Sequence, residues 1–129
     1  MNNIDYTKYL GIPFKWGGSS VKEGFDCYNL IRVVYKEYGI DLPEYVVIND
    51  KQTIATMINE SKQMFKKLDK PNPPCIVTFW IRPPLTTHIG VVIEENKFIH
   101  IMEKTSVSIE KLSAPEWSKR ITGFFVPDF

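Results

Sequence analysis

The stretch Gly24-Phe25-Asp26-Cys27-Tyr28-Asn29-Leu30-Ile31 marks the point at which an irregular, glycine-containing segment passes into a helical pattern. Apolar residues recur at helical spacing over residues 27–38, and Gly39 follows as a stop signal. Cys27 is therefore expected in the first turn of a helix. The free N–H groups and dipole of a helix N-terminus favour thiolate over thiol, which makes Cys27 a candidate nucleophile. The alternative is an inert, packed cysteine.

The only two histidines of the chain could supply a base for this cysteine. His88 opens residues 88–94 and His100 closes residues 97–100, and both segments alternate in the manner of strands. The alternative for each histidine, taken singly, is a structural residue that is hydrogen-bonded to a carbonyl.

The two segments predict a β-hairpin whose register follows from burying its aliphatic residues on one face. That requirement excludes a two-residue turn and predicts a three-residue loop at residues 94–96. The resulting pairs are Ile93 with Lys97, Val91 with Ile99, Gly90 with His100, and His88 with Met102. His88 and His100 then become diagonal neighbours roughly 7 Å apart, and Gly90 leaves room between them. A nucleophile, a base and a group that orients the base form the logic of a catalytic triad.

Several short motifs follow one another along the chain in a set order. They are Gly11-Ile12-Pro13-Phe14-Lys15-Trp16-Gly17-Gly18, Asp26-Cys27, Tyr38-Gly39-Ile40-Asp41-Leu42-Pro43, His88-Ile89-Gly90-Val91 and Phe98-Ile99-His100. In this order they resemble the NlpC/P60 cysteine peptidases over nearly the whole chain. The resemblance implies one α+β, papain-like domain spanning residues 1–129, with the nucleophile at the N-terminus of a helix packed on an antiparallel sheet. It also implies hydrolysis of peptide bonds in the stem peptides of bacterial peptidoglycan, with Cys27 as nucleophile, His88 as general base and His100 as orienting residue.

A closer similarity, to the phage-tail branch of this family, rests on residues 25–32, residues 42–45 and the closing residues 117–127. It implies a phage or prophage tail-associated enzyme with tail proteins as partners. The wider family usually has Ser-Gly after the cysteine, where this chain has Tyr28-Asn29, and a tyrosine where it has Phe14. Substrate contacts are expected from Phe14, Trp16, Asp26 and Tyr28, although the aromatic members could equally be core residues. Two alternatives stay open: a tail-assembly protein that keeps the fold without activity, and acyl transfer to an amine.

Composition restricts the partners. The chain has 129 residues and a formal net charge of +1, so no electrostatic argument favours nucleic acid or an anionic membrane surface. Residues 1–10 lack the apolar segment of a signal peptide. We therefore expect synthesis in the cytoplasm, and action in the periplasm or cell wall after packaging in a virion tail or release on lysis.

Cys75 has three interpretations: a disulfide with Cys27, a Cys2His2 zinc site, or a packed side chain. A chain that is not exported is made in a reducing compartment, where disulfides rarely persist. The spacing of the two cysteines and two histidines is unlike that of structural zinc sites. We expect a packed Cys75, and no metal or cofactor.

The remaining segments are expected to form the scaffold. A second helix is predicted over about residues 51–67, capped by Asn49 or Asp50, and residues 71–74 read as a rigid connector. Strands are predicted at 76–81, 107–111 and 121–127, with a loop at 82–87 and a helical turn at 115–119.

Overall fold

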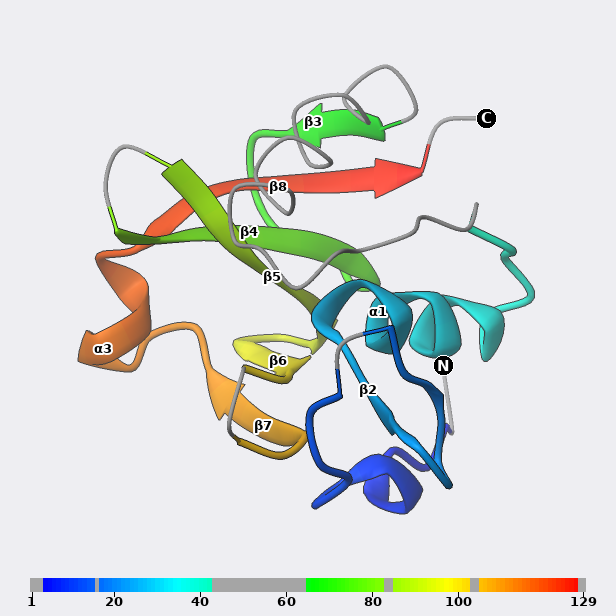
Figure 1. Cartoon of the computed structure of the whole chain (residues 1–129). Coiled ribbons are helices and arrows are strands. Elements are labelled where there is room, and N and C mark those ends of the chain that lie inside the picture. The colour runs from blue at the N-terminus through cyan, green and yellow to red at the C-terminus, as the bar shows by residue number, and fades with distance from the viewer. Residues whose placement is uncertain (1–3, 16, 43–64, 83–84, 103–104, 128–129) are drawn as a thin grey trace.

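The computed structural model describes residues 4–15, 17–42, 65–82, 85–102 and 105–127. Its centre is a six-stranded antiparallel sheet in the order β3-β8-β4-β5-β6-β7 (Figure 1). The strands are β3 (Phe65–Leu68), β4 (Cys75–Arg82), β5 (Leu85–Glu94), β6 (Lys97–His100), β7 (Ser108–Lys111) and β8 (Ile121–Pro127). This sheet confirms the predicted antiparallel core.

Short elements surround the sheet. The N-terminal part of the chain forms η1 (Thr7–Tyr9) and the two-stranded ribbon of β1 (Ser19–Ser20) and β2 (Gly24–Phe25). Helix α1 (Cys27–Lys36) follows directly, and α3 (Pro115–Ser118) precedes β8. In Figure 1 these two helices lie at different ends of the molecule. Among the described residues, no helix is long and apolar enough to cross a membrane.

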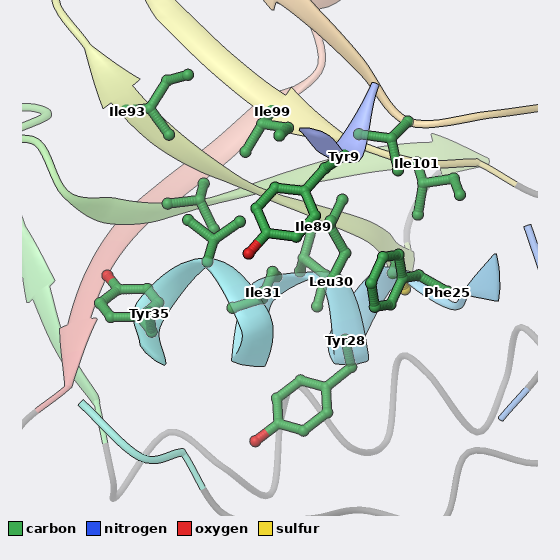
Figure 2. Packing of buried hydrophobic residues seen from close by; sticks show 14 of the residues in the cluster. Tyr9, Phe25, Tyr28, Leu30, Ile31, Tyr35, Ile89, Ile93, Ile99 and Ile101 are labelled. Carbon is green, nitrogen blue, oxygen red and sulfur yellow. The ribbon is translucent and has the colours of Figure 1, made fainter. Parts of the chain in front are cut away.

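One face of the sheet is covered by α1. Leu30 and Ile31 of the helix lie against the aliphatic residues of β5 and β6 (Figure 2). The five aliphatic residues that were predicted to share a buried face belong to this α1 cluster: Ile89, Val91, Ile93, Ile99 and Ile101. Their common burial confirms the alternation on which the hairpin register was based.

The opposite face carries a second group of buried side chains, here called the Trp117 cluster. It consists of Cys75, Val77, Phe79, Val92, Phe98, Leu112 and Trp117. Because successive residues of a strand point to opposite faces, Val92 and Phe98 fall on this side while Val91 and Ile99 fall on the other. Cys75 is fully buried in this cluster, as predicted.

The ends of α1 follow local rules. Asp26 is the N-cap, and its Oδ1 accepts a hydrogen bond of 2.8 Å from the backbone N–H of Asn29. The helix ends at Lys36, and Gly39 adopts a left-handed φ of 78° two residues after the C-cap. The predicted helix and its stop signal are both confirmed, with the last two predicted residues forming a turn.

The hairpin of β5 and β6 has the predicted register but a different turn. Val91 pairs with Ile99, as expected, whereas Glu94 pairs with Lys97 after a register shift at Ile93. The predicted three-residue loop is therefore wrong: a β-bulge takes up the extra residue, and two residues complete the turn. Asn96, in that turn, adopts a φ of 63°. The pairing of β5 with β6 ends at Val91 and Ile99, so the described hairpin lacks the predicted pairs of Gly90 with His100 and of His88 with Met102.

Two scaffold predictions are also corrected. Residues 65–67 were predicted as the end of a helix but belong to β3, which pairs with β8; the rest of that predicted helix lies outside the described residues. Residues 85–87 were predicted as loop but extend β5, where Trp80 pairs with Thr86. Strand β8 has the predicted bounds, and β7 and α3 each lie within their predicted ranges.

Candidate active site

Cys27 is the first residue of α1, as predicted, but its surroundings do not favour a thiolate. Its side chain is 3% exposed. Burial and the nearby charge of Asp26 raise the pKa of Cys27 to about 12, outweighing the backbone N–H groups of Tyr28 and Cys27, which lower it. The resting thiol is therefore protonated at neutral pH, and the expectation of a thiolate created by the helix N-terminus is wrong.

Asp26, a buried side chain next to Cys27, fixes the start of α1. Its Oδ2 accepts hydrogen bonds from the backbone N–H of Gly17 at 3.0 Å and from Asn29 Nδ2 at 3.3 Å. The side chain is fully buried, and burial raises the pKa of Asp26. The observed role of Asp26 is to cap α1 and anchor the preceding loop, and its contact with substrate stays a prediction.

The two histidines meet as the hairpin register predicted. His88 Nε2 lies 2.8 Å from His100 Nδ1, and the ring centroids are 5.0 Å apart. A Cβ on Gly90 would lie 3.2 Å from His100 Cβ, which explains why glycine occupies this position. An unpaired residue of β5 precedes His88, since Phe79 pairs with His88 and Trp80 with Thr86. Such bulges redirect neighbouring side chains.

Both imidazoles are neutral at neutral pH. Burial, followed by the effect of His100, lowers the pKa of His88 to about 3. Burial also lowers the pKa of His100, although Glu110 acts in the opposite direction. A neutral His88 whose Nε2 is engaged by His100 has only Nδ1 left to accept a proton.

Sequence reasoning missed the residue that extends this pair. His100 Nε2 is hydrogen-bonded to Glu110, and Ser108 Oγ lies 3.3 Å from the same nitrogen. Trp117 Nε1 donates a 3.0 Å hydrogen bond to Glu110 Oε1. The signal was available, because His100 pairs with Ser108 in a β6–β7 register that puts Glu110 diagonal to His100.

Aromatic rings enclose the histidine pair. Phe79 stacks on His88 with ring centroids 5.5 Å apart, and Trp117 lies 5.7 Å from His88 and 4.8 Å from His100. These rings belong to the Trp117 cluster. The histidines therefore sit in an apolar environment in which hydrogen bonds and charges act more strongly than in water.

Cys27 has a different set of neighbours. It belongs to the α1 cluster, and the hydrogen bonds of the described residues include none from its sulfur to either imidazole. The structure thus joins two of the three predicted catalytic residues, and the approach of His88 to Cys27 stays a prediction.

The predicted aromatic substrate contacts have different surroundings. Phe14 is half-buried against the α1 cluster and forms a bridge with Phe25, and Trp16 lies outside the described residues. Tyr28 is buried, and its ring projects from the side of α1 away from the sheet (Figure 2). The positions of Phe14 and Tyr28 do not test whether these rings contact substrate, so the predicted contacts also stay predictions.

The described part of the chain contains no set of side chains that could form the alternative Cys2His2 zinc site. Both cysteines are free thiols, Cys27 in the α1 cluster and Cys75 in the Trp117 cluster. Within the described ranges, no three His, Cys, Asp or Glu side chains come together as a metal site would require.

A comparison with known families agrees with this arrangement. The NlpC/P60 family profile matches residues 11–126, which include the α1 start and both histidines. The chain belongs to the NlpC/P60 family. Members of this family are cysteine endopeptidases, and its fold is the α+β, papain-like fold that was predicted.

Individual relatives cover most of this chain. Over 117 residues the chain is 47% identical to the bifunctional muramidase/DL-endopeptidase CwlT of Bacillus subtilis, covering 91% of this chain and 33% of CwlT. It is 30% identical over 119 residues to the gamma-DL-glutamyl hydrolase of the same organism, covering 90% of this chain and 26% of the relative. The chain thus spans a third or less of the length of these two relatives.

A solved structure shows the same fold at similar length. The NlpC/p60 domain of the peptidoglycan hydrolase SagA superimposes with a TM-score of 0.60 and 25% sequence identity. The match covers 94% of this chain and 91% of that one.

Proposed function

We propose that this NlpC/P60 chain is a cysteine endopeptidase that hydrolyses peptide bonds in the stem peptides of bacterial peptidoglycan. The observation that carries the proposal is the 2.8 Å contact between His88 Nε2 and His100 Nδ1, in a chain whose Cys27 opens α1. The names of the relatives support the substrate class: two describe DL-endopeptidase or DL-glutamyl hydrolysis, and SagA is a peptidoglycan hydrolase.

The first chemical step starts from neutral groups. As the Cys27 sulfur attacks the carbonyl carbon of the scissile bond, its proton passes to His88 Nδ1. The carbonyl oxygen becomes an oxyanion, which the backbone N–H of Cys27 and a neighbouring donor stabilise. His100 accepts the hydrogen bond from His88 and holds the ring in the orientation that this transfer needs.

The remaining steps release both products. His88 gives the proton to the leaving amine as the C–N bond breaks, and an acyl group remains on the sulfur as a thioester. Water then attacks the thioester carbonyl while His88 takes a proton from it. The C–S bond breaks, His88 returns that proton to the sulfur, which restores the thiol, and the released acid loses its own proton to solvent and becomes a carboxylate. Phe14, Trp16 and Tyr28 are proposed to line the substrate groove, with Asp26 supporting it.

The biological setting is a second part of the proposal. The run Phe25-Asp26-Cys27-Tyr28-Asn29-Leu30-Ile31-Arg32 supports a phage or prophage tail-associated role, with the chain carried to the periplasm or cell wall in a virion tail. Sedimented tail particles should then contain the chain, as detected by peptide mass spectrometry. Its absence from particles of the producing strain would contradict this setting without touching the chemistry.

Digestion of purified peptidoglycan tests the activity. Wild-type protein should release fragments that carry one new amine and one new carboxylate for each bond cut, as measured by mass spectrometry. Cys27→Ala should release none, whereas Cys75→Ala, which removes a thiol from the opposite face of the sheet, should retain the activity. Undiminished cleavage by Cys27→Ala, or no cleavage by wild type, would contradict the proposal. Amide products formed with an added primary amine would instead indicate acyl transfer.

The alternative function is an inactive tail-assembly protein of the same fold. The observation that favours it is the burial of Cys27, a residue that is 3% exposed and whose thiol has a pKa raised to about 12. This alternative predicts no cleavage by wild type together with a stable fold, so the same digestion distinguishes the two functions.

A further inference from the structure

We propose that Glu110 is a positioning residue that sets the tautomers of both histidines, so that His88 Nδ1 carries a lone pair rather than a proton. The inference rests on the proposed peptidase function, because that lone pair is what would accept the thiol proton of Cys27. It is argued from a row of four side chains that runs from Trp117 through Glu110 and His100 to His88.

The direction of the row is set at its Trp117 end. An indole N–H can only donate, and it donates to Glu110 Oε1 at 3.0 Å. An ionised carboxylate can only accept. Hydrogen bonds from Trp117 and His100 outweigh the effect of burial and keep the pKa of Glu110 below its ordinary value, so the group is ionised at neutral pH.

Each following contact then has one permitted direction. Because Glu110 accepts, the neutral His100 ring carries its proton on Nε2 and has a lone pair on Nδ1. That lone pair, 2.8 Å from His88 Nε2, requires the proton of His88 to be on Nε2. The remaining nitrogen of His88, Nδ1, is left unprotonated and can act as a base.

The opposite arrangement would block the proposed reaction. If His100 carried its proton on Nδ1, it would donate to His88 Nε2, and His88 would hold its own proton on Nδ1. Ser108 Oγ, 3.3 Å from His100 Nε2, does not decide between the two arrangements, since a hydroxyl can donate or accept. Only the carboxylate of Glu110 does so.

A carboxamide at position 110 should reverse the row, because the two oxygens of Glu110 accept from two ring N–H donors, Trp117 and His100, while the hydroxyl of Ser108 also hydrogen-bonds to the carboxylate. The carboxamide of Glu110→Gln has one oxygen. That oxygen is the only acceptor that the side chain offers to the Trp117 N–H. When that oxygen accepts the hydrogen bond from Trp117, the amide N–H₂ group faces His100 Nε2. His100 Nε2 must then be the acceptor. Adding Trp117→Phe removes the competing donor, so the oxygen can turn to His100 and restore the original tautomers.

The chain has only two histidines, which allows a direct measurement. Long-range proton–nitrogen correlation spectra of ¹⁵N-labelled protein at pH 7 identify which ring nitrogen carries the proton. We expect Nε2–H on both rings in wild type, Nδ1–H on both in Glu110→Gln, and a return to Nε2–H in Glu110→Gln with Trp117→Phe. Glu116→Gln, an exposed neighbour of Trp117, and Ser108→Ala serve as controls that should leave the wild-type tautomers unchanged.

Turnover provides the second readout. Glu110→Gln should lower kcat on peptidoglycan about 10-fold, less than the loss expected for removing His100, which contacts the base directly, and KM should change little. The double variant should recover part of that loss, which a merely destabilised fold would not do. Nδ1–H on His100 in wild type, or wild-type tautomers in Glu110→Gln, would overturn the proposal. An inactive wild type with Nε2–H on both rings and the predicted reversal in Glu110→Gln would refute the peptidase function and leave the positioning role of Glu110 intact.

Discussion

His88 Nε2 and His100 Nδ1 lie 2.8 Å apart across the β5–β6 hairpin. This single contact engages one nitrogen of each ring and gives the two histidines different roles. The second nitrogen of His100, Nε2, is hydrogen-bonded to Glu110, whereas the second nitrogen of His88, Nδ1, is available for proton transfer. The pair is therefore asymmetric although both residues are histidines.

Replacing each histidine should reveal that asymmetry. His88→Ala should lower kcat by at least about 10³-fold, because it removes the group proposed to take the thiol proton. His100→Ala should cost less, about 10²-fold, since it removes orientation and leaves the base. The measurement is the initial rate of peptide release at equal concentrations of folded protein. Equal losses in the two variants would contradict the assignment of base and orienting residue.

The reactivity of Cys27 should follow its raised pKa. Since iodoacetamide reacts with thiolate, a pKa of about 12 predicts slow labelling at pH 6 and a rate that rises about tenfold per pH unit from pH 7 to 9. Burial also raises the pKa of Cys75, so Cys75 should likewise label slowly at pH 6. Peptide mass spectrometry of time points gives both rates.

A different pH profile would point to a different resting state. A plateau in Cys27 labelling below pH 8 that disappears in His88→Ala would show a preformed thiolate–imidazolium pair. That result would refute the neutral pair from which the first chemical step was derived.

Gly90 should tolerate no side chain. A Cβ there would lie 3.0 Å from the backbone oxygen of Ile99 and 3.2 Å from His100 Cβ, so Gly90→Ala must move the strand that carries His100. We expect a loss of about 1–3 kcal/mol in the free energy of unfolding, together with reduced turnover. Chemical denaturation and peptide release measure the two effects.

Gly39→Ala is the matched control for this variant. It places alanine at a left-handed φ of 78° with no atom within 4 Å of the new Cβ, which should cost about 1 kcal/mol through backbone strain alone. Turnover should stay at the wild-type level. If Gly39→Ala reduces turnover as much as Gly90→Ala does, the effect of Gly90 reflects general destabilisation.

Chelation should leave the fold unchanged. A Cys2His2 zinc site would need both thiols and both imidazoles at roughly 2.0–2.3 Å from one ion. Cys27 and Cys75 instead lie in clusters on opposite faces of the sheet. We expect the same Tm with and without EDTA, measured by differential scanning calorimetry. Stoichiometric zinc in the purified protein, with a Tm that falls on chelation, would refute this prediction.

Local sequence determined much of the framework. Helical spacing followed by Gly39 located α1, and alternation over residues 88–100 located the strands and the face that they bury, since both signals depend on near neighbours in the chain. The same alternation brought His88 and His100 together, and applied to β7 it would also have found Glu110.

Tertiary structure decided the features that depend on distant partners. Residues 65–67 have a helical pattern but form a strand, because pairing with β8 supplies backbone hydrogen bonds that a local pattern cannot anticipate. A bulge at Ile93 changed the turn while keeping the register. The pKa of Cys27 depends on desolvation by the folded core and on the charge of Asp26. Its position at the start of a helix therefore predicted the wrong direction for the pKa shift. Trp117 of α3 donates a hydrogen bond to Glu110 of β7 only in the folded chain, and no periodicity in the sequence indicates that contact.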